Sequence, residues 1–233
     1  IFVYLPGVST VRRHGIGEIT LKPFRVAIII CMVVAVLQAF PGDARAIDVT
    51  YPAGIKKIDS DFQSDFGMDG GARRNEHQGI DIGGRSGQPI LAVADGTVLE
   101  ATAEGCWGPT VAVDHGNDAN GNKVVALYGH VGEMLVSEGD QIKRGDVIAR
   151  LGEIRGTYEC VGANLHLHFQ LGRLYRDKNS KSSYWGSNYF LEDGRTGVNP
   201  HLYWADGPGK VTCFELNRIY PPGSLTYPFP CAT

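Results

Sequence analysis

Leu165-His-Leu-His-Phe-Gln-Leu171 alternates apolar with polar side chains, and it is the clearest local pattern in the chain. Successive side chains of a β-strand point to opposite faces of a sheet, so this period of two predicts a strand with one face on the core. His166 and His168 then project together from the other face. Two neighbouring imidazoles would repel each other if both were protonated, and a metal ion or partners that fix their tautomers would remove that repulsion.

Similar short apolar runs recur from Gly79 onward, each bounded by a turn signal rich in Gly, Asp or Asn. No window keeps a helical period over three turns, so the pattern predicts a single all-β domain of short antiparallel strands. Besides the strand above, the expected strands are Pro89–Ala94, Gly96–Ala101, Thr110–Asp114, Lys123–Tyr128, Gln141–Ile142 and Asp146–Leu151.

Residues 1–46 differ from the rest and are expected to be an export signal with an upstream extension. Lys22 and Arg25 precede the apolar run Val26–Leu37, which Gln38-Ala-Phe40 extends, and Ala44-Arg-Ala46 offers an A-x-A cleavage site. A helix of about 15 residues spans near 22 Å, short of the ~30 Å of a bilayer core. We therefore expect a periplasmic or secreted protein without a membrane span in its mature form; an uncleaved N-terminal anchor is the alternative.

We divide the remaining chain into three parts: a lead-in segment (47–76), a core domain (77–172), and a long loop with a C-terminal extension packed on the core (173–233). The lead-in is rich in Asp, Gly and Ser and shows little periodicity, which predicts loop-like structure. Residues 173–199 form a polar stretch with aromatics, and unstructured loops of that length are uncommon unless they are functional.

The expected mature part is acidic. Five of the 22 Lys and Arg and two of the 25 Asp and Glu lie in residues 1–46, which leaves the rest with a net charge near −6. Nucleic-acid binding needs clustered Lys and Arg to neutralise phosphates, so we expect no nucleic-acid partner.

Four cysteines follow residue 46, and an even number in an exported protein favours disulfides. We expect Cys106 to pair with Cys160, because their segments should flank the His-rich strand. Cys213 would then pair with Cys231 and close a short C-terminal loop. The two other connectivities, and free buried thiols, are the alternatives.

His77-Gln-Gly-Ile-Asp81 adds a second pair of candidate metal ligands. Together with the two strand histidines it offers nitrogen and oxygen ligands to one borderline-soft cation such as Zn²⁺, and it leaves an imidazole over. Spare imidazoles, including His130 after the strand at Tyr128, can transfer protons or bind an oxyanion. The surplus favours an enzyme over a structural metal site. The residues alone leave open which of His166 and His168 binds the metal.

Five motifs in order along the chain resemble the lysostaphin and LytM-type zinc metallopeptidases, which cleave peptidoglycan cross-bridges. They are His77-Gln-Gly-Ile-Asp81, Val113-Asp-His-Gly116, Leu127-Tyr-Gly-His130, Gly139-Asp-Gln-Ile-Lys-Arg-Gly-Asp-Val-Ile-Ala149 and Leu165-His-Leu-His-Phe169. The likeness runs from about Asp65 to Gly172. It implies a duplicated-hybrid-motif-like β sandwich or barrel with a zinc site in an open groove.

The resemblance also implies roles for single residues. His77, Asp81 and His168 would bind one Zn²⁺ per chain, and His130 and His166 would be the catalytic pair. The likeness makes His115 structural rather than catalytic. His201, outside the motifs, is expected at the surface.

We therefore expect a secreted or periplasmic zinc metalloendopeptidase, a monomer, that hydrolyses peptide bonds in bacterial peptidoglycan cross-links. The alternative is a non-catalytic peptidoglycan-binding or hydrolase-activating module of the same fold. Degenerate relatives of that kind lack ligands, whereas all five positions are filled in this chain. A peptidase of general protein substrates is a third hypothesis.

Overall fold

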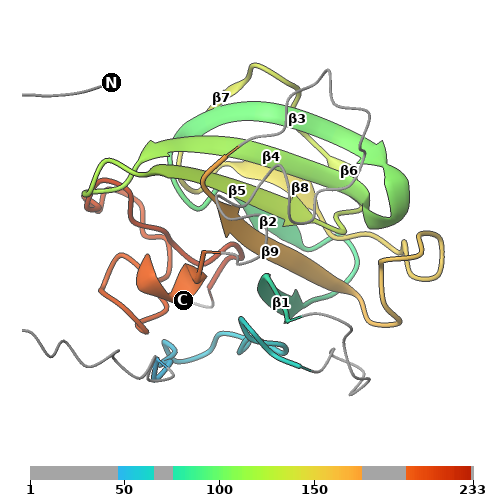
Figure 1. Cartoon of the computed structure of the whole chain (residues 1–233), viewed down its shortest axis with the longest axis horizontal. Helices are drawn as coiled ribbons and strands as arrows, with labels where there is room; N and C mark the ends of the chain where they lie inside the picture. The colour runs from blue at the N-terminus through green and yellow to red at the C-terminus, as the bar shows by residue number, and fades with distance from the viewer. Residues whose placement is uncertain (1–46, 66–75, 175–197, 232–233) are drawn as a thin grey trace, which may run out of the picture. The chain divides into compact units, whose positions relative to one another are not determined.

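The computed structural model describes residues 47–65, 76–174 and 198–231 (Figure 1). The expected export signal and most of the long polar loop lie outside these residues. In the described part of the chain there is no helix long and apolar enough to cross a bilayer.

The described residues fold into nine β-strands and two short 3₁₀ helices, η1 and η2, and they contain no α-helix, so the all-β expectation is confirmed. The strands are β1 (Gly79–Gly83), β2 (Pro89–Leu91), β3 (Gly96–Glu104), β4 (Gly108–Asn117), β5 (Lys123–Gly129), β6 (Glu133–Met134), β7 (Gln141–Ile142), β8 (Val147–Arg150) and β9 (His166–Gly172). η1 spans Gly105–Trp107 and η2 spans Pro200–Leu202.

The strands form two antiparallel sheets (Figure 1). The larger sheet has the order β1-β9-β5-β4-β3-β7 and the smaller one has the order β2-β8-β6. Buried side chains of both sheets meet in one main core, which includes Val98 and Val113 from the larger sheet and Ile90 and Ile148 from the smaller one. The two sheets therefore bury one shared apolar interior, as a sandwich does.

The two faces of the larger sheet have different surroundings. Along β4 and β5, alternate residues enter the main core, while Ala112, Val125 and Leu127 between them form a second small cluster. In β9 the core members are Leu167, Phe169 and Leu171. By the period of two, the intervening histidines lie on the face turned away from the main core.

Segments outside the core domain contribute to the same interior. Trp204, Tyr227 and Phe229 of the C-terminal extension are buried members of the main core. The lead-in joins the fold through isolated bridges, from Thr50 to Lys210 and from Ser60 to Asp81. The extension thus supplies part of the core itself and also contacts the lead-in.

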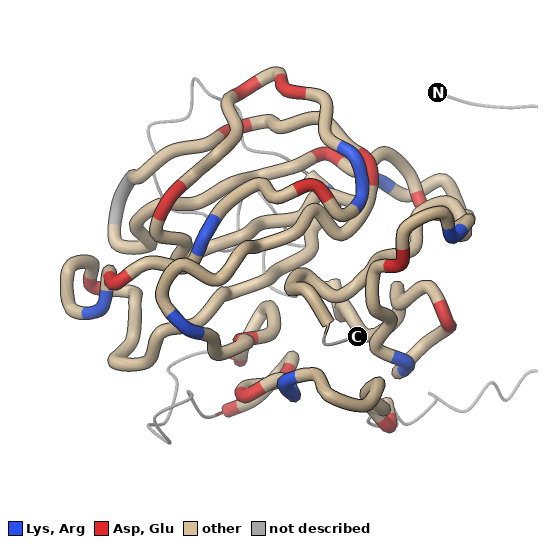
Figure 2. The backbone as a smooth tube through the Cα atoms, turned by 180° about the vertical axis from the view of Figure 1, so that it is seen from behind, with Lys and Arg blue, Asp and Glu red and all other residues tan. Residues whose placement is uncertain are grey.

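Both expected disulfides are present, Cys106–Cys160 and Cys213–Cys231. The first joins η1 to the loop that precedes β9, and the main-chain N–H of Cys160 donates to the carbonyl of Cys106 at 2.9 Å. Figure 2 shows basic and acidic residues interspersed over the described backbone, without a continuous basic stripe.

Candidate metal centre

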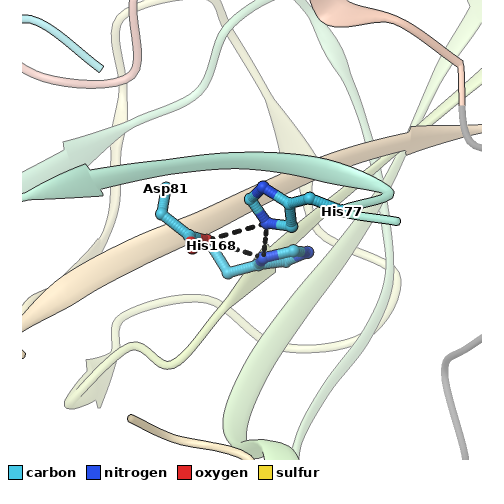
Figure 3. Close-up of side chains that lie close together, drawn as sticks. All are labelled: His77, Asp81 and His168. Carbon is cyan, nitrogen blue, oxygen red and sulfur yellow. Dashed lines mark hydrogen bonds and ion pairs between the residues drawn. The ribbon is translucent and has the colours of Figure 1, made fainter. Parts of the chain in front are cut away.

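Three predicted ligands converge on one point of the larger sheet. Asp81 of β1 lies directly opposite His168 of β9 in the antiparallel register, and His77 precedes β1. His77 Nε2 is 3.1 Å from Asp81 Oδ1 and 3.1 Å from His168 Nδ1, and His168 Nδ1 is 2.9 Å from Asp81 Oδ1. Figure 3 shows the three side chains turned toward one another. All three are buried, with exposed fractions of 3 to 5%.

A main-chain carbonyl fixes the tautomer of His77. His77 Nδ1 lies 2.9 Å from the carbonyl oxygen of Asp61. A carbonyl only accepts, so Nδ1 carries the proton and donates it. The neutral ring then has its lone pair on Nε2, which is the atom that faces Asp81 and His168.

Gln170 holds the outer nitrogen of His168. Gln170 Oε1 is 3.1 Å from His168 Nε2, so an Nε2–H that donates to it leaves the lone pair on Nδ1. Burial lowers the pKa of His168 and favours the neutral ring, although Asp81 opposes this. Gln170 was not among the predicted site residues, yet the period of two in β9 places it on the same face as His168.

The three converging atoms fit a divalent cation. Burial raises the pKa of Asp81, whereas hydrogen bonds and charge interactions with His168 and His77 lower it well below its usual value, so Asp81 is a carboxylate that accepts a proton shared with these rings when no cation lies between them. Two imidazole lone pairs and a carboxylate oxygen about 3 Å apart repel one another unless a proton or a cation lies between them. Two nitrogens and one oxygen are a donor set that zinc accepts in catalytic sites, where the fourth position stays open. The group of His77, Asp81 and His168 is therefore able to bind a metal.

His130 and His166 lie beside this group. His130 follows β5 with a φ of 62°, a left-handed conformation that costs a non-glycine residue about 1 kcal/mol or more. Its ring centroid is 5.0 Å from that of His166 and 5.7 Å from that of His168. His166 Nε2 is 3.8 Å from Asp81 Oδ1. The structure thus brings all five predicted site residues together.

Both of these rings are also oriented by main-chain carbonyls. His130 Nδ1 donates to Trp107 O at 2.9 Å, and His166 Nδ1 donates to Asn164 O at 2.8 Å. In its neutral form, each ring therefore has its lone pair on Nε2. Burial, together with the nearby rings of His168 and His166, lowers the pKa of His130 to about 3, so this ring is neutral at pH 7.

Trp107 is a further neighbour that was not predicted from the sequence. Its indole packs edge-on against His168, with centroids 4.9 Å apart, and lies 5.3 Å from the ring of His130. It follows Cys106, so the Cys106–Cys160 disulfide holds it next to the loop that leads to His166. None of the sequence motifs includes Trp107. Its place beside the site depends on how the folded chain brings η1 close to His130 and His168.

His115 lies apart from the five residues. Its Nδ1 donates to Asp95 O at 2.9 Å, and its Nε2 is 3.2 Å from the hydroxyl of Tyr128. That hydroxyl accepts from Val93 N at 3.0 Å and so donates its own proton to His115. Both ring nitrogens are engaged within the fold, which is the arrangement expected of a structural histidine.

The expectation that His201 lies at the surface is wrong. Its side chain is 2% exposed. η2 carries it under the lead-in, where its Nε2 is 2.7 Å from Asp61 Oδ1 and its Nδ1 accepts from Trp204 Nε1 at 2.9 Å. The C-terminal extension had no periodic pattern that could reveal this packing.

Solved structures with a similar backbone include the catalytic domain of the antimicrobial peptidase lysostaphin from Staphylococcus simulans. It is 23% identical, with a TM-score of 0.37 over 66% of this chain and 86% of that one. A structure of LytU is 20% identical, with a TM-score of 0.44 over 72% of this chain and 94% of that one.

Curated relatives match the segment that holds the site. Lipoprotein NlpD of Yersinia enterocolitica is 36% identical over 92 residues, which are 39% of this chain and 84% of that protein. The murein hydrolase activator NlpD of Escherichia coli K12 is 35% identical over 102 residues, 43% of this chain and 24% of that protein. A lipoprotein NlpD/LppB homolog of Pseudomonas aeruginosa is 38% identical over 98 residues, 42% of this chain and 29% of that protein. This chain therefore spans less than a third of the length of the last two.

A family model matches the same segment. The model of peptidase family M23 matches residues 75–182, which contain all five predicted site residues. Together with the relative that is matched over 84% of its length, this confirms the resemblance drawn from the motifs. The chain belongs to peptidase family M23.

Proposed function

We propose that this chain is a secreted or periplasmic zinc metalloendopeptidase that hydrolyses peptide bonds in bacterial peptidoglycan. His77, Asp81 and His168 would hold one Zn²⁺, and His130 and His166 would act on the reacting groups. The observation that carries the proposal is the complete set of converging acceptor atoms at three buried residues, with two further imidazoles beside them. The two disulfides support an extracytoplasmic location, since such bonds persist in oxidising compartments.

The two neighbouring imidazoles suit proton transfer. A bound zinc ion supplies Lewis acidity, which polarises a peptide carbonyl and lowers the pKa of a water molecule. A neutral His130 or His166 can take up a proton at Nε2 when water adds to the carbonyl carbon. The resulting N–H can donate to the developing oxyanion or pass the proton to the leaving amine nitrogen as the amide bond breaks. Each ring keeps its Nδ1–H on a main-chain carbonyl throughout.

Digestion of purified sacculi tests the proposal. The full chain, loaded with one equivalent of zinc, should release peptides whose new amino and carboxyl termini are identified by mass spectrometry. His166→Ala should lower the rate by about a hundredfold or more, the scale of general acid–base catalysis, while it keeps the three zinc ligands. The absence of new termini from the zinc-loaded wild-type chain would refute an endopeptidase.

One observation favours a second candidate function. The Escherichia coli relative is named a murein hydrolase activator. In this alternative the chain binds peptidoglycan and stimulates another hydrolase without turnover of its own. The same sacculi with a separate purified murein hydrolase distinguish the two: an activator releases nothing alone, raises release by the added hydrolase, and keeps that effect in His166→Ala.

A further inference from the structure

The lead-in segment holds β1, which carries Asp81, and the residues just before it, which include His77. β1 lies at the edge of the larger sheet, where its outer side needs hydrogen-bond partners. Asp59 N donates to Asp81 O at 2.9 Å, and Asp81 N donates to Ser60 O at 2.8 Å. Gln63 N donates to His77 O at 2.7 Å. The backbone at both His77 and Asp81 is therefore fixed by residues outside the segment that the M23 family model matches.

The same segment also orients the imidazole of His77. The carbonyl of Asp61 accepts from Nδ1, which directs Nε2 to the metal centre. The position of this carbonyl depends on the turn at Asp61, whose carboxylate accepts from Phe62 N at 2.7 Å. That carboxylate is half exposed, with 53% of the side chain open to solvent.

A buried pair in the C-terminal extension anchors the Asp61 turn from the other side. An indole N–H only donates, so Trp204 Nε1 donates a hydrogen bond to His201 Nδ1 at 2.9 Å. The proton of a neutral His201 must then lie on Nε2, which donates to Asp61 Oδ1 at 2.7 Å. His201 and Trp204 are each 2% exposed, and a buried donor without a partner is costly, so the pair keeps the carboxylate in place.

We infer that Asp61, His201 and Trp204 are positioning residues for the metal centre. They connect the C-terminal extension to His77 through the lead-in, and none of them lies in residues 75–182. In metal sites, the partner of the outer nitrogen of a histidine fixes its tautomer and direction, and its loss weakens metal affinity. This inference rests on the proposed zinc site and adds to it a support that the family segment does not contain.

Zinc affinity and cobalt spectra of variants of the full chain test the inference. Asp61→Ala removes the acceptor for His201 and Phe62 at an exposed position, and it should weaken zinc binding about tenfold in competition with a chelating dye. The visible absorption of the Co²⁺-loaded variant should change in band shape, because the geometry at His77 changes. Asp61→Asn keeps an acceptor oxygen and should restore both readouts to wild-type values. Trp204→Phe should shift zinc affinity in the same direction as Asp61→Ala.

Asp206→Ala is the matched control. Asp206 is a 44% exposed carboxylate that pairs with Arg218 within the same extension. Its loss should leave zinc affinity and the cobalt spectrum unchanged. If Asp61→Ala keeps wild-type affinity and spectrum, or if Asp61→Asn is as impaired as Asp61→Ala, the positioning role is refuted. If the wild-type chain binds no zinc, the proposed function fails as well, whereas a wild-type chain that binds zinc beside an unimpaired Asp61→Ala refutes the positioning role alone.

Discussion

The neighbouring strands β4 and β5 each position a histidine, and the two histidines differ in how their ring nitrogens are used. His115 of β4 has both nitrogens engaged, by Asp95 O and by the hydroxyl of Tyr128. His130 after β5 has only Nδ1 on a carbonyl, that of Trp107, and its ring packs beside His166 and His168. A ring with both nitrogens bonded within the fold stabilises the fold, while a ring with one nitrogen left can act on a ligand.

A lowered pKa does not separate these two environments. Burial lowers the pKa of His115 to about 4 and contributes most to lowering that of His130 to about 3. The site differs from the surroundings of His115 in that four histidine rings lie close to one carboxylate, that of Asp81. Each of these rings has its outer nitrogen hydrogen-bonded.

The largest expected change in zinc affinity comes from removing one of the three proposed metal ligands. His168→Ala deletes a nitrogen that lies 2.9 Å from Asp81 Oδ1 and 3.1 Å from His77 Nε2. Zinc affinity, measured by calorimetric titration, should fall more than about a hundredfold, beyond the effect of losing a supporting partner. Retention of one tightly bound zinc by His168→Ala would contradict the ligand assignment.

The next effect concerns the spacing between β1 and β9. A Cβ at Gly79 would lie 2.5 Å from Phe169 O and 3.0 Å from His168 Nε2. Gly79→Ala should push the strands apart, cost about 1 to 3 kcal/mol of stability, and weaken zinc binding along with it. Gly162, exposed and with no atom within 4 Å of such a Cβ, is the control, and Gly162→Ala should leave thermal unfolding and zinc affinity unchanged. Equal behaviour of the two alanine variants would show that this close approach does not set the site.

A smaller effect is expected on the structural side. His115→Leu removes the donor to Asp95 O and the acceptor of the Tyr128 hydroxyl, and it should cost about 1 to 2 kcal/mol in urea unfolding. Zinc affinity and sacculus digestion should stay within about twofold of wild type, since His115 shares no partner with the centre. A His115→Leu protein that folds but loses zinc would end the distinction between the two environments.

The last effect is the pH dependence of the metal-free protein in EDTA. An unfolded histidine has a pKa near 6.5, so between about pH 6.5 and pH 4 the unfolded state binds more protons than the folded state at His130 and His115. Stability should therefore be fully present above about pH 6.5 and fall as the pH drops through this range. His130→Asn and His115→Asn should each reduce that slope by up to about one proton. A slope unaffected by both substitutions would argue against neutral rings.

Local patterns in the sequence were enough to predict much of the fold and the centre of the site. The alternation in β9 predicted the common direction of His166 and His168, and the pairing Asp81 to His168 places the second motif beside them. Gln170 could have been found from the same alternation. β6 was not among the expected strands.

The groups that orient the site histidines could not be predicted from the sequence, for a physical reason. Asp61 and His201 are separated by 140 positions, and their contact depends on the extension packing its aromatics into the core. The carbonyls of Asp61, Trp107 and Asn164 that orient the histidines carry no side-chain signal at all. Every residue has a main-chain carbonyl, so a pattern of residue types does not indicate which carbonyl accepts a hydrogen bond.

X-ray absorption at the zinc edge of the purified chain, loaded with one equivalent of zinc, tests the converging site most directly. We expect one zinc per chain, with two imidazole nitrogens and carboxylate oxygen at about 2.0 to 2.2 Å. Loss of one imidazole from this shell in His77→Ala should accompany the loss of affinity. A chain that binds no stoichiometric zinc, or whose zinc shell is the same in His77→Ala as in wild type, would contradict the assignment of His77, Asp81 and His168 as ligands.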